Sequence, residues 1–314
     1  MKHYRWGIIG LGDIAHQFAQ TFKSNDSEIY GVAARNFTKV QAFAEEFNIP
    51  KAYQTVESLL KDSEIDLIYI AVPNNVHHEY IMEALHAGKH VLCEKAITMN
   101  SQELDEEVAL AKEKNLILQE AMTIFNMPLF HELKKIGTSG KLGKLKMIQA
   151  PFGSYKEPDP TNRFFNPDLA GGALLDIGTY AVSFARYFLT ENPKVLFSDV
   201  LPFETGVDEQ SITVLRNTKN EMASVVLSFQ AKMPKQGVVA YEKGYIVVND
   251  YPRADQAEIV YNDGTKEVVE AGQSQEALNY EIQNFINTVN GEKNETLPLT
   301  QDVIRILDDM KSFW

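Results

Sequence analysis

The chain has 314 residues, which is enough for two domains of ordinary size. Hydrophobic residues make up 44% of it and charged residues 23%, so it is expected to bury a sizeable core. Lys and Arg total 30 against 43 Asp and Glu, and the net charge of -13 argues against a nucleic acid partner. No apolar run approaches the roughly 20 residues of a membrane span. The single cysteine, Cys93, excludes an intramolecular disulfide and a cysteine-built metal site, and it favours a cytoplasmic location.

Short apolar runs alternate with amphipathic segments through residues 1–121. The apolar runs predict strands at 5–9, 29–34, 66–72, 90–93 and 116–119. The amphipathic segments predict helices at 14–22, 38–47 and 101–114, and a further helix that Asn74 or Asn75 can cap and that runs through Ala87. Repeated βα units of this kind predict an α/β Rossmann domain with a doubly wound parallel sheet.

A different pattern follows over residues 122–314, where extended segments succeed one another without helices between them. Strands are expected near 144–150 and at 195–201, 211–215, 222–230, 237–241, 245–249, 258–261 and 266–269. Helices are expected at 129–136, 172–189, 276–289 and 301–311. Asn262-Asp263-Gly264 predicts a hairpin turn. The second domain is therefore expected to be α+β with a largely antiparallel sheet, and to bind substrate.

This second sheet is also expected to mediate oligomerisation. Val225, Leu227 and Phe229 alternate along one strand, and an antiparallel sheet covered by helices on one face needs cover on the other. A second subunit is the natural cover, so a homodimer or homotetramer through the C-terminal sheet is expected.

A glycine-rich turn, Gly10-Leu11-Gly12-Asp13-Ile14-Ala15, lies between the first predicted strand and helix. In this context Gly10 permits a tight turn, Gly12 lets the backbone approach a pyrophosphate, and Ala15 is small enough for close helix–strand packing. The helix N-terminus supplies N–H groups to the phosphates. The turn predicts a dinucleotide cofactor.

The end of the second strand favours NADP, with NAD as the alternative. An NAD enzyme usually carries an acid there for the ribose hydroxyls, and this chain has Ala33-Ala34-Arg35. Arg35 is suited to a 2′-phosphate, with Lys39 one turn further on. The alternative reading of Arg35 is a surface arginine that binds no ligand.

Four blocks of sequence point to a known family. They are Gly10–Ala15, Ala71-Val72-Pro73-Asn74 with His77, Ala87–Val91 leading to Glu94-Lys95, and Gly171–Tyr180. Together they resemble the Gfo/Idh/MocA oxidoreductases, named for glucose–fructose oxidoreductase and inositol dehydrogenase. The last block looks most like the subgroup of dimeric dihydrodiol dehydrogenase and NADP-dependent xylose dehydrogenase. The resemblance implies hydride transfer between a nicotinamide and a carbinol or carbonyl carbon of a sugar, polyol or diol-like molecule.

The resemblance also implies a catalytic set. By this resemblance Lys95 would lie between the nicotinamide and the substrate. The residue after it is Ala96, where the family has proline. Tyr180 is the expected general acid and base, and an adjacent ammonium such as Lys95 would lower its reference pKa of about 10. Asp176, four residues earlier on the same helix face, would hold a substrate hydroxyl or orient Lys95. Gly178 between them hints that something packs close to the helix backbone.

The remaining assignments are of contact residues. Ala71, Pro73, Asn74, His77 and Glu94 are expected to border the cofactor, and His77 is alternatively a structural histidine. His77 and His78 cannot point the same way on a helix, so no metal site is expected. Arg163 is expected to touch cofactor or substrate, or else to form a plain surface salt bridge.

One segment departs from the family. Relatives often carry an aromatic residue, arginine and histidine where this chain has the apolar Met122–Met127. A less polar pocket would suit a reductase of a non-carbohydrate carbonyl or imine. A dinucleotide-binding sensor without catalysis is the other alternative, and the presence of Lys95, Asp176 and Tyr180 together favours the enzyme.

Overall fold

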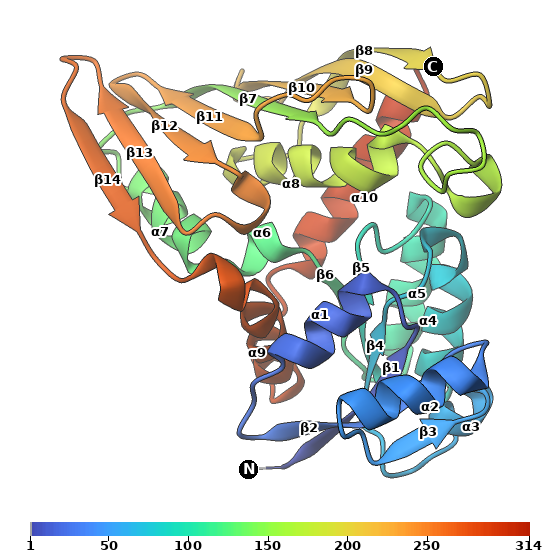
Figure 1. Ribbon diagram of the computed structural model, residues 1–314. Coiled ribbons are helices and arrows are strands. Elements are labelled where there is room, and N and C mark those ends of the chain that lie inside the picture. The colour runs from blue at the N-terminus through green and yellow to red at the C-terminus, as the bar shows by residue number, and fades with distance from the viewer. Residues whose placement is uncertain (1) are drawn as a thin grey trace. The chain divides into compact units, whose positions relative to one another are not determined.

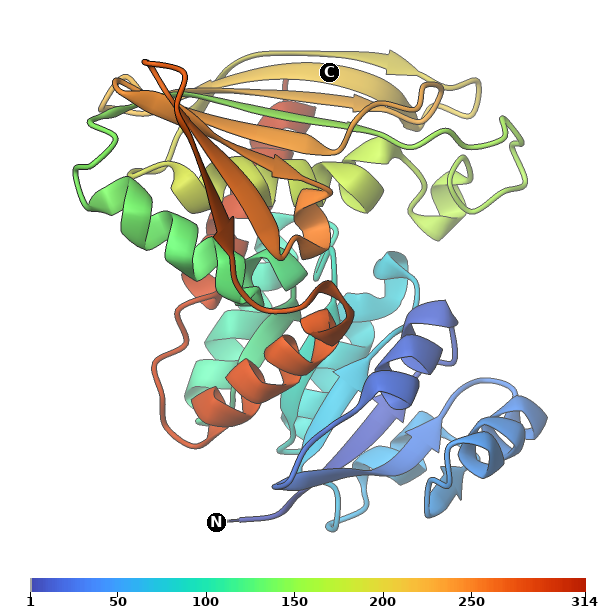
Figure 2. The ribbon, with the colours of Figure 1, turned by 60° about the vertical axis from the view of Figure 1, so that its left-hand side comes forward.

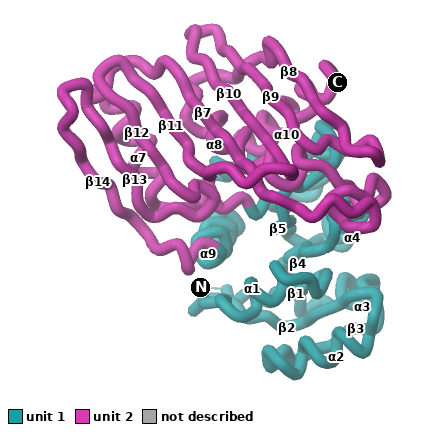
Figure 3. Tube along the Cα trace, turned by 45° about the horizontal axis from the view of Figure 1, so that its top comes forward, with its two compact units in different colours: residues 1–121, 278–297 teal, residues 122–277, 298–314 magenta. Residues whose placement is uncertain are grey.

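The computed structural model describes residues 2–314, and the chain divides into two compact units (Figure 3). The first unit runs to residue 121 and also includes residues 278–297, and the second comprises 122–277 and 298–314. The sequence had placed 278–297 in the second domain, so this assignment is corrected.

The first unit is built on a six-stranded sheet in the order β3-β2-β1-β4-β5-β6, with every pair parallel (Figure 1). Its strands are β1 (Tyr4–Ile9), β2 (Ser27–Ala33), β3 (Lys51–Tyr53), β4 (Leu67–Ile70), β5 (His90–Glu94) and β6 (Leu118–Ala121). The helices between them are α1 (Asp13–Thr21), α2 (Phe37–Glu46), α3 (Val56–Leu60), α4 (His77–His86) and α5 (Ser101–Glu113). The predicted doubly wound α/β domain is confirmed.

The core of this unit explains why α9 (Ala277–Val289) belongs to it. Trp6 of β1 is fully buried, and its ring lies 5.7 Å from Phe18 of α1 and 5.3 Å from Phe285 of α9. The Tyr4 hydroxyl also donates to the Asn290 side chain just after the helix, at 2.8 Å. Burial of these large aromatic surfaces fixes α9 against the parallel sheet.

The second unit is built on an eight-stranded sheet in the order β14-β13-β12-β11-β7-β10-β9-β8. Only the β7–β10 pair is parallel, so the predicted largely antiparallel sheet is confirmed. Its strands are β7 (Leu145–Gly153), β8 (Lys194–Pro202), β9 (Asp208–Arg216), β10 (Met222–Ser228), β11 (Gln236–Tyr241), β12 (Gly244–Asn249), β13 (Gln256–Tyr261) and β14 (Lys266–Glu270). The predicted turn at Asn262–Gly264 joins β13 to β14.

Helices cover one face of this second sheet (Figure 2). They are α6 (Thr123–Asn126), α7 (Pro128–Thr138), α8 (Thr179–Phe188) and α10 (Leu297–Lys311). Val225, Leu227 and Phe229 are buried beneath them. On the opposite face Phe197, Ile212 and Met147 are 45–50% exposed. The uncovered apolar residues therefore include these three and not Val225, Leu227 and Phe229, which had been named from the sequence. No helix in residues 2–314 has the length and apolar character needed to cross a bilayer.

Candidate active site

Three of the sequence blocks meet at one edge of the parallel sheet. Gly10 directly follows β1, Ala71 follows β4 and Lys95 follows β5, and these three strands are neighbours in the sheet. Doubly wound sheets bind their ligands at the carboxyl ends of the strands, where the strand order reverses. Here the order reverses between β1 and β4, so the fold brings the predicted cofactor residues to the expected place.

The glycine-rich turn has space for a phosphate group. Gly10 adopts φ +103°, and a Cβ there would lie 2.2 Å from the Ala71 carbonyl oxygen, so glycine is required by the fold itself. Gly12 adopts an ordinary φ of -75°, and a Cβ there would meet no protein atom within 4 Å. No contact within the chain requires glycine at position 12. A pyrophosphate that approached the N-terminus of α1, which has no side-chain cap, would require it. The residues present therefore fit a dinucleotide.

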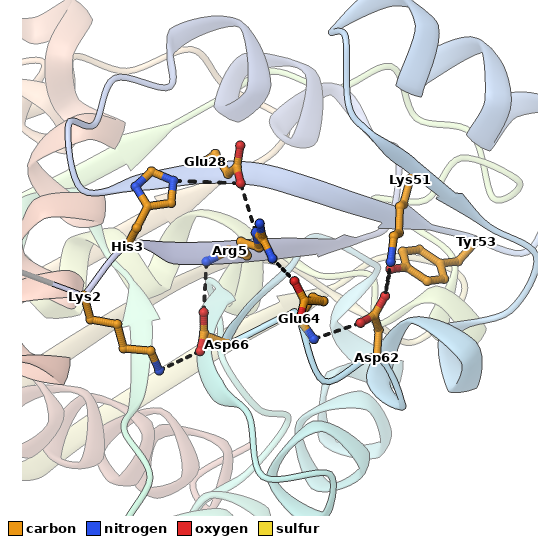
Figure 4. Close-up of polar contacts among 9 residues, drawn as sticks. All are labelled: Lys2, His3, Arg5, Glu28, Lys51, Tyr53, Asp62, Glu64 and Asp66. Carbon is orange, nitrogen blue, oxygen red and sulfur yellow. Dashed lines mark hydrogen bonds and ion pairs between the residues drawn. The ribbon is translucent and has the colours of Figure 1, made fainter.

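Arg35 and Lys39 lie next to this edge, and both side chains are exposed. Neither forms an ion pair or a side-chain hydrogen bond with any residue of 2–314. The cations at the opposite, amino-terminal edge behave differently, as Figure 4 shows. There Lys51 contacts Asp62 at 2.7 Å, and Arg5 contacts Glu28 at 3.0 Å. In an acidic chain, two adjacent cations left without carboxylates are suited to an incoming anion.

The turn that carries Lys95 is held from several sides. Glu94 is almost fully buried and accepts hydrogen bonds from the Tyr69 hydroxyl at 2.5 Å and from the Lys95 N–H at 3.3 Å. The Ile97 N–H donates to Glu120 of β6 at 3.1 Å. The Lys95–Ala96 peptide bond is cis, and Ala96 is fully buried. Glu120 was not assigned to the site from the sequence, because nothing local links it to a turn more than twenty residues earlier.

His77 and His78 point to different partners. His77, the first residue of α4, is fully buried with its ring nitrogens facing the backbone carbonyls of Val72, Ala96 and Ile97. This geometry favours the structural alternative for His77 over direct contact with a ribose. His78 lies with Nδ1 2.9 Å from buried Glu107. Among residues 2–314, no group of three His, Cys, Asp or Glu side chains is arranged to hold a metal ion.

Asp176 and Tyr180 lie in the second unit, on a π-helical turn (Leu174–Gly178) that continues into α8. Both are half-buried while the residues between them are buried, so the two side chains emerge on one face. A Cβ at Gly178 would lie 2.7 Å from Leu227 of β10, which is the close packing that the glycine predicted. Single π-helical turns are frequent at functional sites.

Asp208, at the start of β9, caps the helix that carries Asp176 and Tyr180. Its Oδ2 accepts a hydrogen bond from the Leu174 N–H at 2.6 Å. Burial raises the pKa of Asp208 to about 7, and the backbone hydrogen bonds oppose that rise. Gly172, with φ +123°, makes room for the carboxylate, since a Cβ there would lie 2.2 Å from Oδ1. No local pattern indicated this cap, because Asp208 lies 34 residues beyond Leu174.

A cavity of about 1000 Å³ within the second unit includes Tyr180 in its wall. The Phe152 ring lies 6.2 Å from the Tyr180 ring, and the Lys235 ammonium lies 5.1 Å from the Phe152 ring. Arg253 and Asp250 contribute further charged groups to the wall. Sequence patterns did not single out these residues, since they come from strand ends far apart in the chain.

Two other predicted positions lie elsewhere in the second unit. Arg163 is exposed, and its guanidinium stacks 4.1 Å from the Phe164 ring. The six residues Met122–Met127 are all buried, and Asn126 donates to the Met122 carbonyl at 2.9 Å. This segment is part of the core, so its apolar character is explained by burial.

Comparison with known proteins matches the GFO/IDH/MocA oxidoreductase family with an NAD-binding Rossmann fold to residues 4–122, and the GFO/IDH/MocA C-terminal domain to residues 130–247. The chain belongs to the Gfo/Idh/MocA oxidoreductase family. The trans-1,2-dihydrobenzene-1,2-diol dehydrogenase of Xenopus tropicalis is 35% identical over 250 residues, which are 78% of this chain and 74% of that protein. The human enzyme of the same name is 35% identical over 247 residues, or 77% and 73% of the two chains.

Two solved structures share the fold over nearly the whole chain. A 3-ketoreductase from Actinomadura kijaniata in complex with NADP and TDP-benzene matches with a TM-score of 0.88 and 22% identity, covering 99% of this chain and 98% of the other. A levoglucosan dehydrogenase in complex with NADH and L-sorbose matches with a TM-score of 0.89 and 21% identity, covering 100% and 97%. The oxidoreductase function and the family that the sequence blocks predicted are confirmed.

Proposed function

We propose that this Gfo/Idh/MocA protein uses NADP(H) to move hydride to or from the carbon of a small diol, polyol or sugar. The observation that carries the proposal is the carboxyl edge of the parallel sheet. Its glycine turn leaves room for a pyrophosphate, and Arg35 and Lys39 lie beside it without carboxylate partners. A 2′-phosphate would supply the anion that these two cations lack, which favours NADP over NAD.

The chain's own residues would then handle the proton and the developing charge. The residues of the carboxyl edge would hold a dinucleotide, which when bound would supply or take up the hydride. We assign to Tyr180 the proton that accompanies it, given to the carbonyl oxygen in reduction and taken from the hydroxyl in oxidation. The Lys95 ammonium would stabilise negative charge on that oxygen and on the phenolate. Asp176, on the same face as Tyr180, would accept a hydrogen bond from a neighbouring substrate hydroxyl.

The substrate class follows from the relatives and from the cavity wall. Two relatives at 35% identity are named dehydrogenases of a vicinal diol. The cavity beside Tyr180 combines aromatic Phe152 with charged Lys235, Arg253 and Asp250, which suits a small molecule with several hydroxyls. The imine alternative loses its support, because Met122–Met127 are core residues.

We also propose that the protein assembles through the open face of its second sheet. Phe197 pairs with Val214 and Ile212 pairs with Val226, so an apolar row crosses neighbouring strands on that face. A second copy of this chain would bury it in a homodimer or homotetramer. A reducing, cytoplasmic location is part of the same proposal, supported by the buried thiol of Cys93.

The direct test is a substrate screen. The purified protein would be incubated with NADP against diols, inositols and aldoses, and with NADPH against ketoses and dicarbonyls, while the dinucleotide absorbance is followed. We expect turnover on at least one diol or sugar. Tight dinucleotide binding with no turnover on any class would favour the sensor instead.

A further inference from the structure

Asp208 joins the large sheet of the second unit to the first turn of the helix that carries Tyr180. The residue begins β9, where its backbone pairs with Pro202 of β8. Its Oδ2 accepts a hydrogen bond from the Leu174 N–H at 2.6 Å. Leu174 is buried, so little water reaches this N–H.

Leu174 is connected in turn to the residue that precedes Tyr180. Its carbonyl oxygen accepts a hydrogen bond from the Thr179 N–H, which closes the π-helical turn. Tyr180 follows directly and lies in the cavity wall, with its ring 6.2 Å from that of Phe152. A displacement of Leu174 would therefore reach Tyr180 through one backbone hydrogen bond and one peptide group.

The source of the cap matters for where this helix lies. A capping side chain from the residue just before a helix satisfies an N–H group but does not fix the helix against another element. Asp208 comes from a strand, so it fixes the start of the helix relative to the sheet that also carries Phe152. The chain makes room for this contact at Gly172, whose φ is +123° and whose Cβ, if present, would lie 2.2 Å from Asp208 Oδ1.

We propose that Asp208 is a positioning residue, which holds Tyr180 in place for proton transfer through Leu174 and the π-helical turn. This inference rests on the proposed function, because its effect falls on the step assigned to Tyr180. Asp208 is not among the residues that line the cavity, so its effect reaches the cavity through the helix. Turnover should therefore depend on it, and dinucleotide affinity should not.

The experiment measures kcat and KM on the best substrate of the screen, NADPH affinity and melting temperature. It is carried out at about pH 8, where Asp208, with a pKa of about 7, is mostly ionised. Asp208→Ala removes the acceptor and should lower kcat about 5- to 50-fold, with KM and NADPH affinity within about 2-fold, since a misplacement of about 1 Å costs up to about 10²-fold.

Two further variants separate loss of the contact from loss of the fold. Asp208→Asn keeps an oxygen for the Leu174 N–H and should keep kcat within about 3-fold of the parent. The hydroxyl of Asp208→Ser lies one bond nearer the backbone, too near to reach Leu174, so kcat should fall as in Asp208→Ala. The serine variant decides the case if the alanine variant does not fold.

A double variant tests whether the effect passes through Tyr180. In a Tyr180→Phe background, Asp208→Ala should lower the remaining turnover by less than about 2-fold, because the hydroxyl that it positions is already gone. A loss that is purely structural would be as large in this background as in the parent.

Glu221 supplies the matched control at the other end of the same helix. It is almost fully buried, and its Oε2 accepts from the Thr190 N–H, just beyond α8, at 2.9 Å. Glu221→Ala should lower the melting temperature and leave kcat unchanged. The proposal is overturned if Glu221→Ala loses as much kcat as Asp208→Ala, if Asp208→Ala keeps the parental kcat, or if its loss is undiminished in Tyr180→Phe. A parent with no turnover on any class of the screen would refute the proposed function itself, and the positioning role with it.

Discussion

Replacing Asp208 by asparagine should flatten the pH dependence of stability in the second unit. Burial raises the pKa of this carboxyl from an ordinary 3.8 to about 7. Between these values the folded chain retains a proton that the unfolded chain has released, so the free energy of unfolding falls as pH rises through that window. A difference of about 3 pKa units corresponds to at most about 4 kcal/mol. Asparagine does not titrate, and its side-chain oxygen is expected to accept from the Leu174 N–H in place of Asp208 Oδ2.

The assay is urea unfolding of parent and Asp208→Asn at about pH 5, inside this window, and at about pH 8, above it. The variant's stability should decline less than the parent's by up to about 2.5 kcal/mol over this range, and the two should be closest at the acid end. Asp199→Asn, which changes an exposed carboxylate in the same unit, is the control and should track the parent. Parallel pH profiles for the parent and Asp208→Asn would refute the reasoning.

Further outcomes concern the site and the assembly. Tyr180→Phe should keep the fold and cofactor affinity and lower kcat by about 10²- to 10⁴-fold, the usual share of general acid–base catalysis. Lys95→Met should lower kcat at least as far. The double variant should lose less kcat than the product of the two single losses. Nearly full turnover by Tyr180→Phe beside an inactive Lys95→Met would assign the proton to lysine. Light scattering should give a dimer or tetramer for the parent and a smaller species for Ile212→Lys on the open sheet face, and a monomeric parent would disprove the assembly.

The order of strands and helices was largely predictable, because the period of the apolar residues changes clearly from one element to the next. Long, strongly patterned segments such as α5 began within a residue of the predicted position. β3, α3 and α6 were missed, since three to five residues are too few to establish a period. The predicted helix at 172–189 contains a π-helical turn that its composition did not reveal.

Which sheet a helix covers could not be predicted. Residues 278–297 have an apolar face, but that pattern is equally compatible with either core. The choice depends on the fit of Phe285 against Trp6, two residues far apart in the chain. An amphipathic pattern predicts that one face of a helix is buried. Tertiary packing alone decides which sheet that face packs against.

The motifs of the candidate site could be predicted from the sequence because each occupies a few consecutive residues after a strand. The groups that hold those motifs in place could not be predicted. Glu120 fixes the Lys95 turn and Asp208 caps the Leu174 helix, and each acts on backbone atoms more than twenty residues away. Such partners carry no local signature, because any acidic residue brought to the right place by the fold would serve.

The proposed NADP(H) site is tested most directly by the dissociation constants of NADPH and NADH for the purified parent and for Arg35→Ala. A charge-assisted contact to a phosphate contributes roughly 1.5–3 kcal/mol, so the parent should bind NADPH about 10- to 150-fold more tightly than NADH. Arg35→Ala should erase most of that margin and leave NADH affinity nearly unchanged. Arg216→Ala, which removes an exposed arginine of the second unit, should preserve the margin. Equal dissociation constants for the two dinucleotides in the parent would contradict the account.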